Sequence, residues 1–237
     1  MPSGLDELEI VEAPGGYVLD PALCLYVPLW KRDGPIFESD DAYGHLCTVT
    51  GALWTPQGRS FDGAGAADDF ISIPAHASLA NLAEVTYLVW IQWVGTIASD
   101  RRIITNTELT TAGKRMVVLA TTTNLYLGAK CATTEAHSIF TNLFSYVGWH
   151  HLMVTYNHNT DKILYLRRNG VAVAPDVGFT AGAGALVDDS ANNWTIGGMA
   201  TVARSWNGII SEIVASNRIL TNAEGDNHYL ATRWRYQ

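Results

Sequence analysis

The sequence predicts an all-β protein, built as an antiparallel sandwich of two stacked sheets. Short apolar runs recur along the chain, and clusters of Gly, Pro, Asn and Asp separate them, as expected of strands joined by turns. Only two segments show a helical pattern. Many short strands with almost no helix are typical of a single β sandwich, and 237 residues are enough for one.

Residues 1–22 are expected to form an N-terminal arm, and residues 23–237 a single domain. The arm alternates acidic and apolar residues before Pro14-Gly15-Gly16 breaks the pattern. We interpret it as a solvated or partner-bound segment rather than a carboxylate site. The sequence shows no signal peptide and no apolar run of transmembrane length, so we expect no membrane insertion, and the compartment stays open.

In the first half of the domain, we expect strands over residues 23–29, 46–54, 59–63, 69–74 and 84–94. Alternation in the last strand places one set of side chains on one face (Val85, Tyr87, Val89, Ile91, Trp93) and another set on the opposite face (Thr86, Leu88, Trp90, Gln92). Because both faces carry large apolar groups, this strand should lie in the middle of a sheet. Residues 77–84 offer one helical turn at most.

In the second half, strands are expected in "RIITNT", "RMVVLAT", "NLYLGAK", "HHLMVTYN", "KILYLRR", "NWTIGG" and "NGIISEIVASNR". Asn169-Gly170 predicts a hairpin, since both residues tolerate the positive φ of a type I′ turn. A short C-terminal helix is expected over residues 221–234. Thr221 and Glu224 have the spacing of a capping box, although Gly225 weakens the helix.

The adjacent histidines His150 and His151 do not predict a metal site. Side chains of consecutive strand residues point to opposite faces of a sheet, so the two rings cannot bind one ion together. Trp149, Met153 and Thr155 should share the face of His151. His158 follows in a turn, and no Glu or His stands at zinc-ligand spacing. We interpret the pair as structural, each ring satisfying a backbone group at the sheet margin.

Composition excludes several classes of protein. Apolar residues make up 48% and charged residues 16%, which favours a packed core over disorder. A net charge of −8 with only isolated basic pairs argues against a nucleic-acid partner. Three cysteines (Cys24, Cys47, Cys131) without a C-x-x-C pair exclude a disulfide framework and a zinc ribbon. Cys24 and Cys47 are either paired or, as we favour, buried thiols.

Three motifs resemble laminin-G-like domains of the concanavalin-A-like lectin/glucanase superfamily. "RSFDGAGAADDFISIP" is similar to an early segment of that family, "GWHHLMVTYN…DKILYLRRNGVAV" to its Trp-His strand and Asn-Gly hairpin, and "WTIGGMATVARSWNGIISEIVASNRILTNAE" to its closing run. They cover about residues 59–230 in the family's order. The resemblance implies a two-sheet jelly roll, with buried tryptophans and a polar clamp of Arg218 with Thr221 and Glu224.

Some relatives in this superfamily are glycoside hydrolases, which need two carboxylates close together on one strand face. Here Glu212 stands alone, because Val214 and Ser216 occupy the positions where further acids would be needed. No other nucleophile or phosphate motif is present. We therefore expect no enzyme activity. A hydrolase would require Glu212 to face an acid from a neighbouring strand.

Calcium is a possible cofactor, since the resemblance implies cation sites in rim loops built from carboxylate and amide oxygens. Two acidic loops provide the candidate metal ligands Asp68, Asp69, Asp188, Asp189 and Asn192. Exposed acidic turns explain these residues equally well. For sugar binding, the candidates are aromatic residues beside turns, Tyr43, Trp54 and Trp206, although each is also suited to be a buried anchor.

Two functions follow from these expectations. The first is a non-catalytic recognition or adhesion module that binds glycan or protein through rim loops. The alternative is a structural virion component, such as a capsid decoration or fibre protein, attached to its assembly through residues 1–22. The basic and aromatic ending "RWRYQ" could serve as a docking strand.

Overall fold

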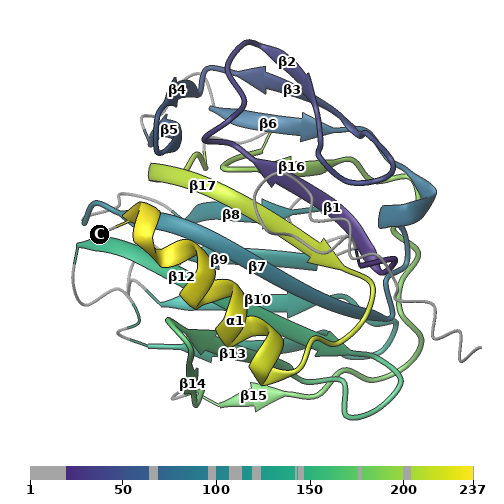
Figure 1. Ribbon diagram of the computed structural model, residues 1–237. Coiled ribbons are helices and arrows are strands. Elements are labelled where there is room, and N and C mark those ends of the chain that lie inside the picture. Colours follow the sequence, from purple (N-terminus) through teal and green to yellow (C-terminus); the bar gives the residue numbers. More distant parts are fainter. Residues whose placement is uncertain are drawn as a thin grey trace, which may run out of the picture.

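In the computed structural model, two antiparallel sheets face each other and a helix lies outside one of them (Figure 1). This confirms the predicted sandwich. The structure describes residues 20–63, 69–95, 100–106, 114–118, 124–141, 143, 147–175, 178–199 and 204–236. Most of the predicted arm lies outside the described residues.

The first sheet has eight strands in the order β14-β13-β12-β7-β17-β5-β4, and β1 also pairs with β17. Strand β7 lies between β12 and β17, so its predicted central position is confirmed. The strand bounds are β1 (Leu23–Pro28), β4 (Leu53–Thr55), β5 (Gly58–Asp62), β7 (Glu84–Trp93), β12 (Gly148–Asn157), β13 (Leu164–Arg168), β14 (Val171–Val173) and β17 (Asn207–Ser216).

The second sheet has nine strands in the order β15-β11-β10-β9-β8-β16-β6-β3-β2. Their bounds are β2 (Ile36–Glu38), β3 (Leu46–Thr50), β6 (Phe70–Ile73), β8 (Arg101–Thr105), β9 (Lys114–Val118), β10 (Leu125–Ala129), β11 (Ala136–Phe140), β15 (Phe179–Thr180) and β16 (Trp194–Ile196). Strands β2, β11 and β15 were not predicted. In β11, the core-facing Ser138 is polar and donates to the Leu164 carbonyl at 2.8 Å, which hides the apolar alternation.

The main core lies between the sheets and follows the predicted alternation of β7. Val85, Val89 and Ile91 are fully buried in it, whereas Leu88 packs in a separate cluster on the outer face of the first sheet. Cys24, Cys47 and Cys131 are buried free thiols, so Cys24 and Cys47 do not pair. Burial, with the nearby Asp41 carboxylate, raises the pKa of Cys47 to about 12.

The single strand predicted over residues 46–54 is wrong, because the chain crosses between sheets there. Strand β3 belongs to the second sheet and β4 to the first. Gly51 turns the chain with a φ of 73°, and the Asp69 carboxylate occupies the space that its Cβ would need. A side chain at this position would clash, so only glycine permits the crossing.

A C-terminal helix, α1 (Asn222–Thr232), lies across the outer face of the first sheet and continues into the short 3-10 helix η2 (Arg233–Tyr236) (Figure 1). The predicted capping box is present, with Thr221 and Glu224 bonded to each other's backbone N–H. Gly225 lets the helix approach the sheet closely, since a Cβ there would lie 2.2 Å from Met153 Sδ. The single turn predicted near residue 77 is the 3-10 helix η1 (Ala77–Leu79).

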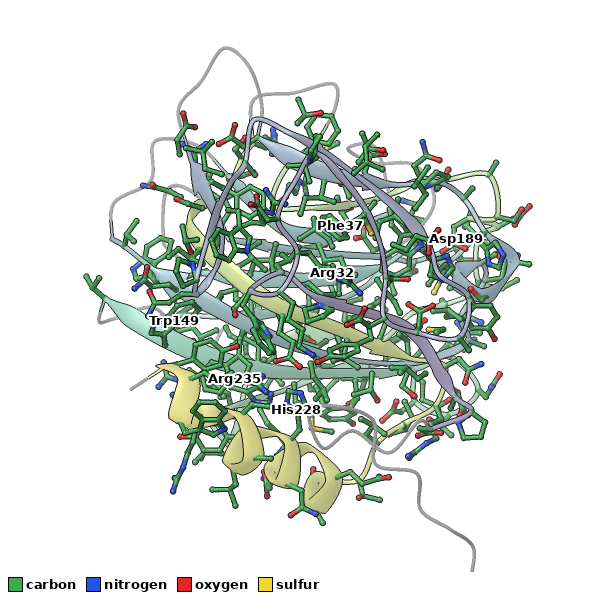
Figure 2. The ribbon with its side chains drawn as sticks, turned by 45° about the horizontal axis from the view of Figure 1, so that its top comes forward. Arg32, Phe37, Trp149, Asp189, His228 and Arg235 are labelled. Carbon is green, nitrogen blue, oxygen red and sulfur yellow. The ribbon has the colours of Figure 1, made fainter. Side chains whose placement is uncertain are left out.

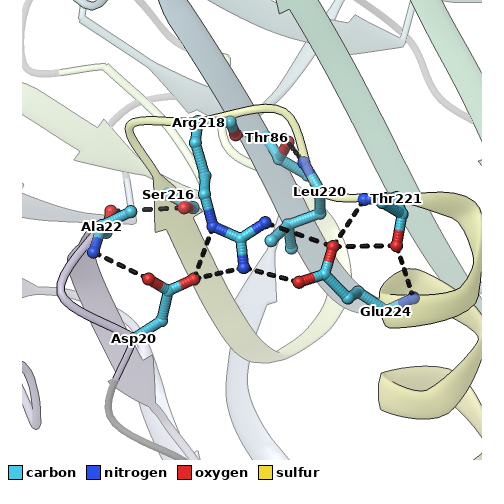
Figure 3. A network of polar contacts seen from close by, with 8 residues as sticks. All are labelled: Asp20, Ala22, Thr86, Ser216, Arg218, Leu220, Thr221 and Glu224. Carbon is cyan, nitrogen blue, oxygen red and sulfur yellow. Dashed lines mark hydrogen bonds and ion pairs between the residues drawn. The ribbon is translucent and has the colours of Figure 1, made fainter.

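The expected polar clamp joins the start of β1, the end of β17 and the start of α1 (Figure 3). Arg218 contacts Asp20 at 2.5 Å and Glu224 at 2.6 Å. Thr86 Oγ1 donates to the Arg218 carbonyl at 2.8 Å and accepts from the Leu220 N–H at 2.9 Å. The Arg218 side chain lowers the pKa of Glu224 to about 2, so the carboxylate stays charged in all but strong acid. None of the helices in the described residues has the length and apolar character of a membrane span.

Candidate functional site

The sequence-predicted ligand residues do not gather in one place. Trp206 is fully buried, packs against Trp93 with ring centroids 5.7 Å apart, and donates its indole N–H to the Gln92 carbonyl at 3.2 Å. Trp206 therefore has the buried-anchor role that the sequence also allowed, and its ring is covered from solvent. Its backbone N–H donates to the Gly197 carbonyl at 2.5 Å, which fixes the residue before β17.

Tyr43 is exposed and lies in a small cluster of aromatic rings at the entrance to β3. Its ring stacks on His45 at 5.6 Å and lies 5.6 Å from the ring of His76. Asp41 holds the loop by accepting the Tyr43 N–H at 2.9 Å and the Tyr26 N–H at 2.9 Å. An exposed ring on a fixed loop can contact a ligand, so Tyr43 stays a predicted ligand residue.

The acidic loop at residues 188–192 is tied down by protein hydrogen bonds. The buried Asp189 accepts from the Asn81 N–H at 2.5 Å and from Asn106 Nδ2 at 2.8 Å. Asp188 accepts from Asn81 Nδ2 at 2.8 Å, and this bond is the main cause of its lowered pKa. The Asn192 N–H donates to the Asp189 carbonyl at 3.0 Å.

The second acidic loop is described in part. Asp69 Oδ2 accepts from the Asp62 N–H at 2.9 Å, while Asp68 lies outside the described residues. Within the parts of the chain that the structure describes, no three His, Cys, Asp or Glu side chains are grouped as a metal site. Calcium binding therefore stays a prediction, and the two loops serve at least to fix turns.

Trp54 belongs to a cluster that we call the aromatic patch, formed by Trp30, Trp54, Trp234 and Arg235. The Trp54 indole N–H donates to the Trp30 carbonyl at 3.2 Å. The Arg235 guanidinium lies 4.4 Å from the Trp30 ring centroid and 5.2 Å from that of Trp234. Trp234 is 67% exposed and Trp54 39%. The patch thus presents aromatic surface to solvent next to a positive charge.

Two more cationic side chains, Lys31 and Arg32, lie near the patch. Lys31 Nζ lies 4.8 Å from the Trp30 ring centroid. The pKa of Lys31 is lowered, first by burial and then by the positive charges of Arg235 and Arg32. Arg32 is paired with Asp40. Lys31 and the anchored Arg235 are therefore the cationic groups that lie over the Trp30 ring.

The loop that carries Trp30 is held from below by the buried Arg59 of β5. Arg59 Nη2 donates to the carbonyls of Arg32 at 2.5 Å and Gly34 at 2.6 Å, and Nη1 donates to that of Ala52 at 3.4 Å. A rigid guanidinium with several donors suits this task. The Trp30 loop and the start of β4 are thus fixed to one side chain.

Arg235 is anchored by Glu212, which is completely buried beneath η2. Glu212 Oε2 lies 3.5 Å from Arg235 Nη1, and Oε1 lies 3.4 Å from His228 Nε2. Figure 2 shows His228 and Arg235 side by side over the first sheet. Burial and the Glu212 charge raise the pKa of the neighbouring phenols Tyr26 and Tyr236. Among the described residues, no second acid contacts Glu212.

A β-bulge directs Glu212 toward the helix. The pairing of β17 with β7 shifts register between Ile210 and Glu212, which leaves Ser211 as an extra residue. Ile210 and Ile213 both point into the core, and Glu212 stands opposite Trp90, on the outer face. If Ser211 were paired in a regular ladder with no bulge, alternation from Ile210 would place Glu212 in the core.

His151 and His228 form a buried contact that the sequence did not indicate, and we call them the histidine pair. His151 Nε2 lies 2.9 Å from His228 Nδ1. Burial, and secondarily the charge of His228, lowers the pKa of His151 well below its ordinary value. The predicted opposite orientation of His150 and His151 is confirmed, since their neighbours Leu152 and Met153 belong to different clusters. The role predicted for His151 is wrong, because its ring meets another imidazole.

The final segment of the chain has a different structure from the predicted docking strand. Residues 233–236 form η2, which sits against the outer face of the first sheet. The Tyr236 ring packs on Trp90 and Trp149, with centroids 4.2 Å and 4.6 Å apart. Its hydroxyl lies 2.8 Å from Ser211 Oγ. These contacts hold Trp234 and Arg235 in position.

The chain belongs to the concanavalin A-like lectin/glucanases superfamily, whose family model matches residues 63–224. This confirms the resemblance of the three motifs to laminin-G-like domains. No curated protein matches the sequence.

Solved structures with similar folds include the binding domain of botulinum neurotoxin DC in complex with SialylT, with a TM-score of 0.67 and 13% identity over 89% of this chain and 52% of that one. The same toxin domain in complex with rat synaptotagmin II gives 0.66 and 12% over the same shares. Trypanosoma rangeli sialidase with the inhibitor DANA gives 0.64 and 15%, over 94% of this chain and 35% of that one.

The chain thus spans about half the length of the toxin binding domains and about a third of the sialidase. At these identities the likeness shows the jelly-roll fold alone. Some of these proteins with this fold are binding domains and another is a sialidase. The function therefore has to be inferred from the site rather than from the fold. These comparisons lend no support to the virion alternative.

Proposed function

We propose that this protein is a non-catalytic recognition module that binds a glycan through the aromatic patch. The observation that carries the proposal is the exposure of Trp234 and Trp54 beside an anchored guanidinium. The C–H face of a sugar ring is apolar and packs well on an indole ring, which offers a large flat apolar surface. The Arg235 N–H groups and Lys31 can then donate to sugar hydroxyl or carboxylate oxygens.

The patch is organised before a ligand arrives, and this supports binding. Arg59 fixes the Trp30 loop through three carbonyls, and Glu212 holds Arg235 from beneath. Side chains that are already ordered lose less conformational entropy on binding, so more of the contact energy contributes to affinity. The Trp30 loop and Arg235, which are far apart in the sequence, are therefore already in place before a ligand binds.

The surroundings of Glu212 support a non-catalytic role. A glycoside hydrolase of the usual type needs a second carboxyl group about 5–10 Å away across the scissile bond. Glu212 is instead fully buried and contacts Arg235 and His228. A buried carboxylate paired with a cation acts as an anchor rather than as an acid or nucleophile.

A protein ligand is the second candidate. Trp and Arg are the residue types that contribute most to protein interfaces, and the patch combines both. Attachment to a larger assembly through residues 1–22 stays a further alternative, tested by deleting those residues and sizing the complexes that form.

Glycan-array binding of the wild type, with and without calcium, tests the proposal. The Trp234→Ala variant should lose about 5- to 150-fold in affinity, since a stacked aromatic contributes roughly 1–3 kcal/mol. The Phe179→Ala variant removes another exposed ring, in the second sheet, and should bind as the wild type does. The Tyr43→Ala variant, measured in the same assay, tests whether the other exposed residue that was predicted to bind a ligand contributes to affinity. If the wild type bound no sugar on the array, or if the Trp234→Ala variant bound as tightly as the wild type, the proposed glycan-binding patch would be contradicted.

A further inference from the structure

Helix α1 is attached to the sheet mainly through polar side chains. Its buried residues are Gly225, His228 and Thr232, and none of them is a large apolar residue. The Trp90 indole N–H donates to Thr232 Oγ1 at 2.8 Å, and His228 contacts both His151 and Glu212. These polar contacts of the helix therefore depend on where the protons of the imidazole rings lie.

The histidine pair has room for one proton between its two facing nitrogens. If His228 Nε2 donates toward Glu212, then His228 Nδ1 must accept from His151 Nε2. Protonating both rings would place two N–H groups against each other at the 2.9 Å contact. Two imidazolium rings so close also repel each other, because burial screens their charges poorly.

The charges around the pair do not relieve this conflict. Glu212 is the carboxylate in contact with the pair, and the Arg235 guanidinium already offsets its charge. Asp226, on the helix, pairs with Arg167 of β13 at 2.8 Å. Within the described part of the chain, phenols also lie nearby: the Tyr229 ring packs beside His151, and Tyr26 and Tyr236 lie close to Glu212.

We propose that protonation of the histidine pair in mild acid releases α1 and η2 from the sheet and thereby takes the aromatic patch apart. The coupling rests on the proposed function, because Trp234 and Arg235 lie in η2 directly after the helix that carries His228. Glu212 links the two, since it contacts both His228 and Arg235. A ligand held at neutral pH would then be released on acidification.

The direction follows from the lowered pKa of His151. In the detached state both rings are in water, where histidine has an ordinary pKa of about 6.5. The detached state then binds more protons, so the attached state is favoured above about pH 6.5 and loses ground below it. The shift is at most about tenfold per pH unit for each extra proton bound.

Hydrogen-exchange mass spectrometry of the whole chain tests this directly, between about pH 7.5 and about pH 5.5, where imidazoles titrate. After correction for intrinsic exchange rates, residues 222–236 should lose protection in acid while β7 and β12 keep theirs. The double variant His151→Gln/His228→Gln should remove this pH dependence, since an amide does not titrate. His137→Gln, which alters a histidine of the second sheet, should retain it.

Protection of residues 222–236 that does not change with pH in the wild type would overturn the proposal. If the double variant folds poorly, His151→Gln alone should still reduce the pH dependence, because the lowered pKa belongs to His151. Glycan affinity, measured in parallel, separates the two proposals. Helix release without any glycan binding contradicts the proposed function alone. Glycan binding that stays constant while the helix detaches contradicts the coupling.

Discussion

The two ends of helix α1 are fixed by ionic contacts of opposite character. At its start, Arg218 and Glu224 form an ion pair in which both side chains are more than one third exposed. Near its end, the fully buried Glu212 contacts Arg235 and His228, whose side chains are only 15% and 5% exposed. Water screens the first group and not the second. The exposed end should therefore contribute little energy and tolerate pH, while the buried end contributes much and is sensitive to pH.

The largest expected effect is that of Glu212→Ala. Removing the carboxylate leaves the buried His228 and the largely covered Arg235 without their partner, and breaking a buried ion pair costs about 3–5 kcal/mol. Urea denaturation of the wild type and the variant measures this loss of unfolding free energy. A loss below about 1 kcal/mol would show that the buried end is as weakly coupled as a surface pair.

A smaller effect is expected for Thr232→Val, which removes the acceptor of the Trp90 indole N–H. A buried donor left unpaired costs about 1–3 kcal/mol. Urea denaturation gives the magnitude, and hydrogen exchange should locate the loss in residues 222–236. Unchanged protection there would mean that ring stacking on Trp90, rather than this hydrogen bond, holds the helix.

The smallest effect is expected at the exposed end, for Glu224→Gln. The variant weakens the contact with Arg218 and should cost no more than about 1 kcal/mol, decreasing further at high salt. The pKa of about 2 for Glu224 means that its contribution persists above the ordinary carboxyl pKa and is lost as pH falls toward 2. Acid denaturation of the wild type and the variant should therefore diverge above about pH 4 and converge near pH 2.

Much of the fold was predictable because it depends on local patterns. Alternation in β7 identified its two faces and its central place, and Thr221 with Glu224 marked the start of the helix. The single strand predicted over residues 46–54 was wrong because the break in it depends on tertiary structure. Apolar residues continue through Gly51, and the crossing there depends on the Asp69 carboxylate, which comes from another strand.

The candidate site was only partly predictable, since its residues come from separate regions of the chain. Trp54 was identified because it lies beside a turn, but Trp30 and Trp234 have no spacing relation to it. The contact between His151 and His228 joins residues 77 positions apart. The chemistry of Glu212 also required the structure, because a lone acid in a strand does not show which neighbours it will meet.

The extra residue at Ser211 makes two halves of one strand independent of each other. The segment before it pairs with β5, and the segment after it pairs with β1. The alternation of inward and outward side chains in one half is therefore independent of the alternation in the other half. Deleting Ser211 would restore an unbroken ladder and leave Glu212 opposite Trp90, but it would remove the hydroxyl that lies 2.8 Å from the Tyr236 hydroxyl. The bulge thus lets one strand present two consecutive polar side chains, Ser211 and Glu212, to the C-terminal helices.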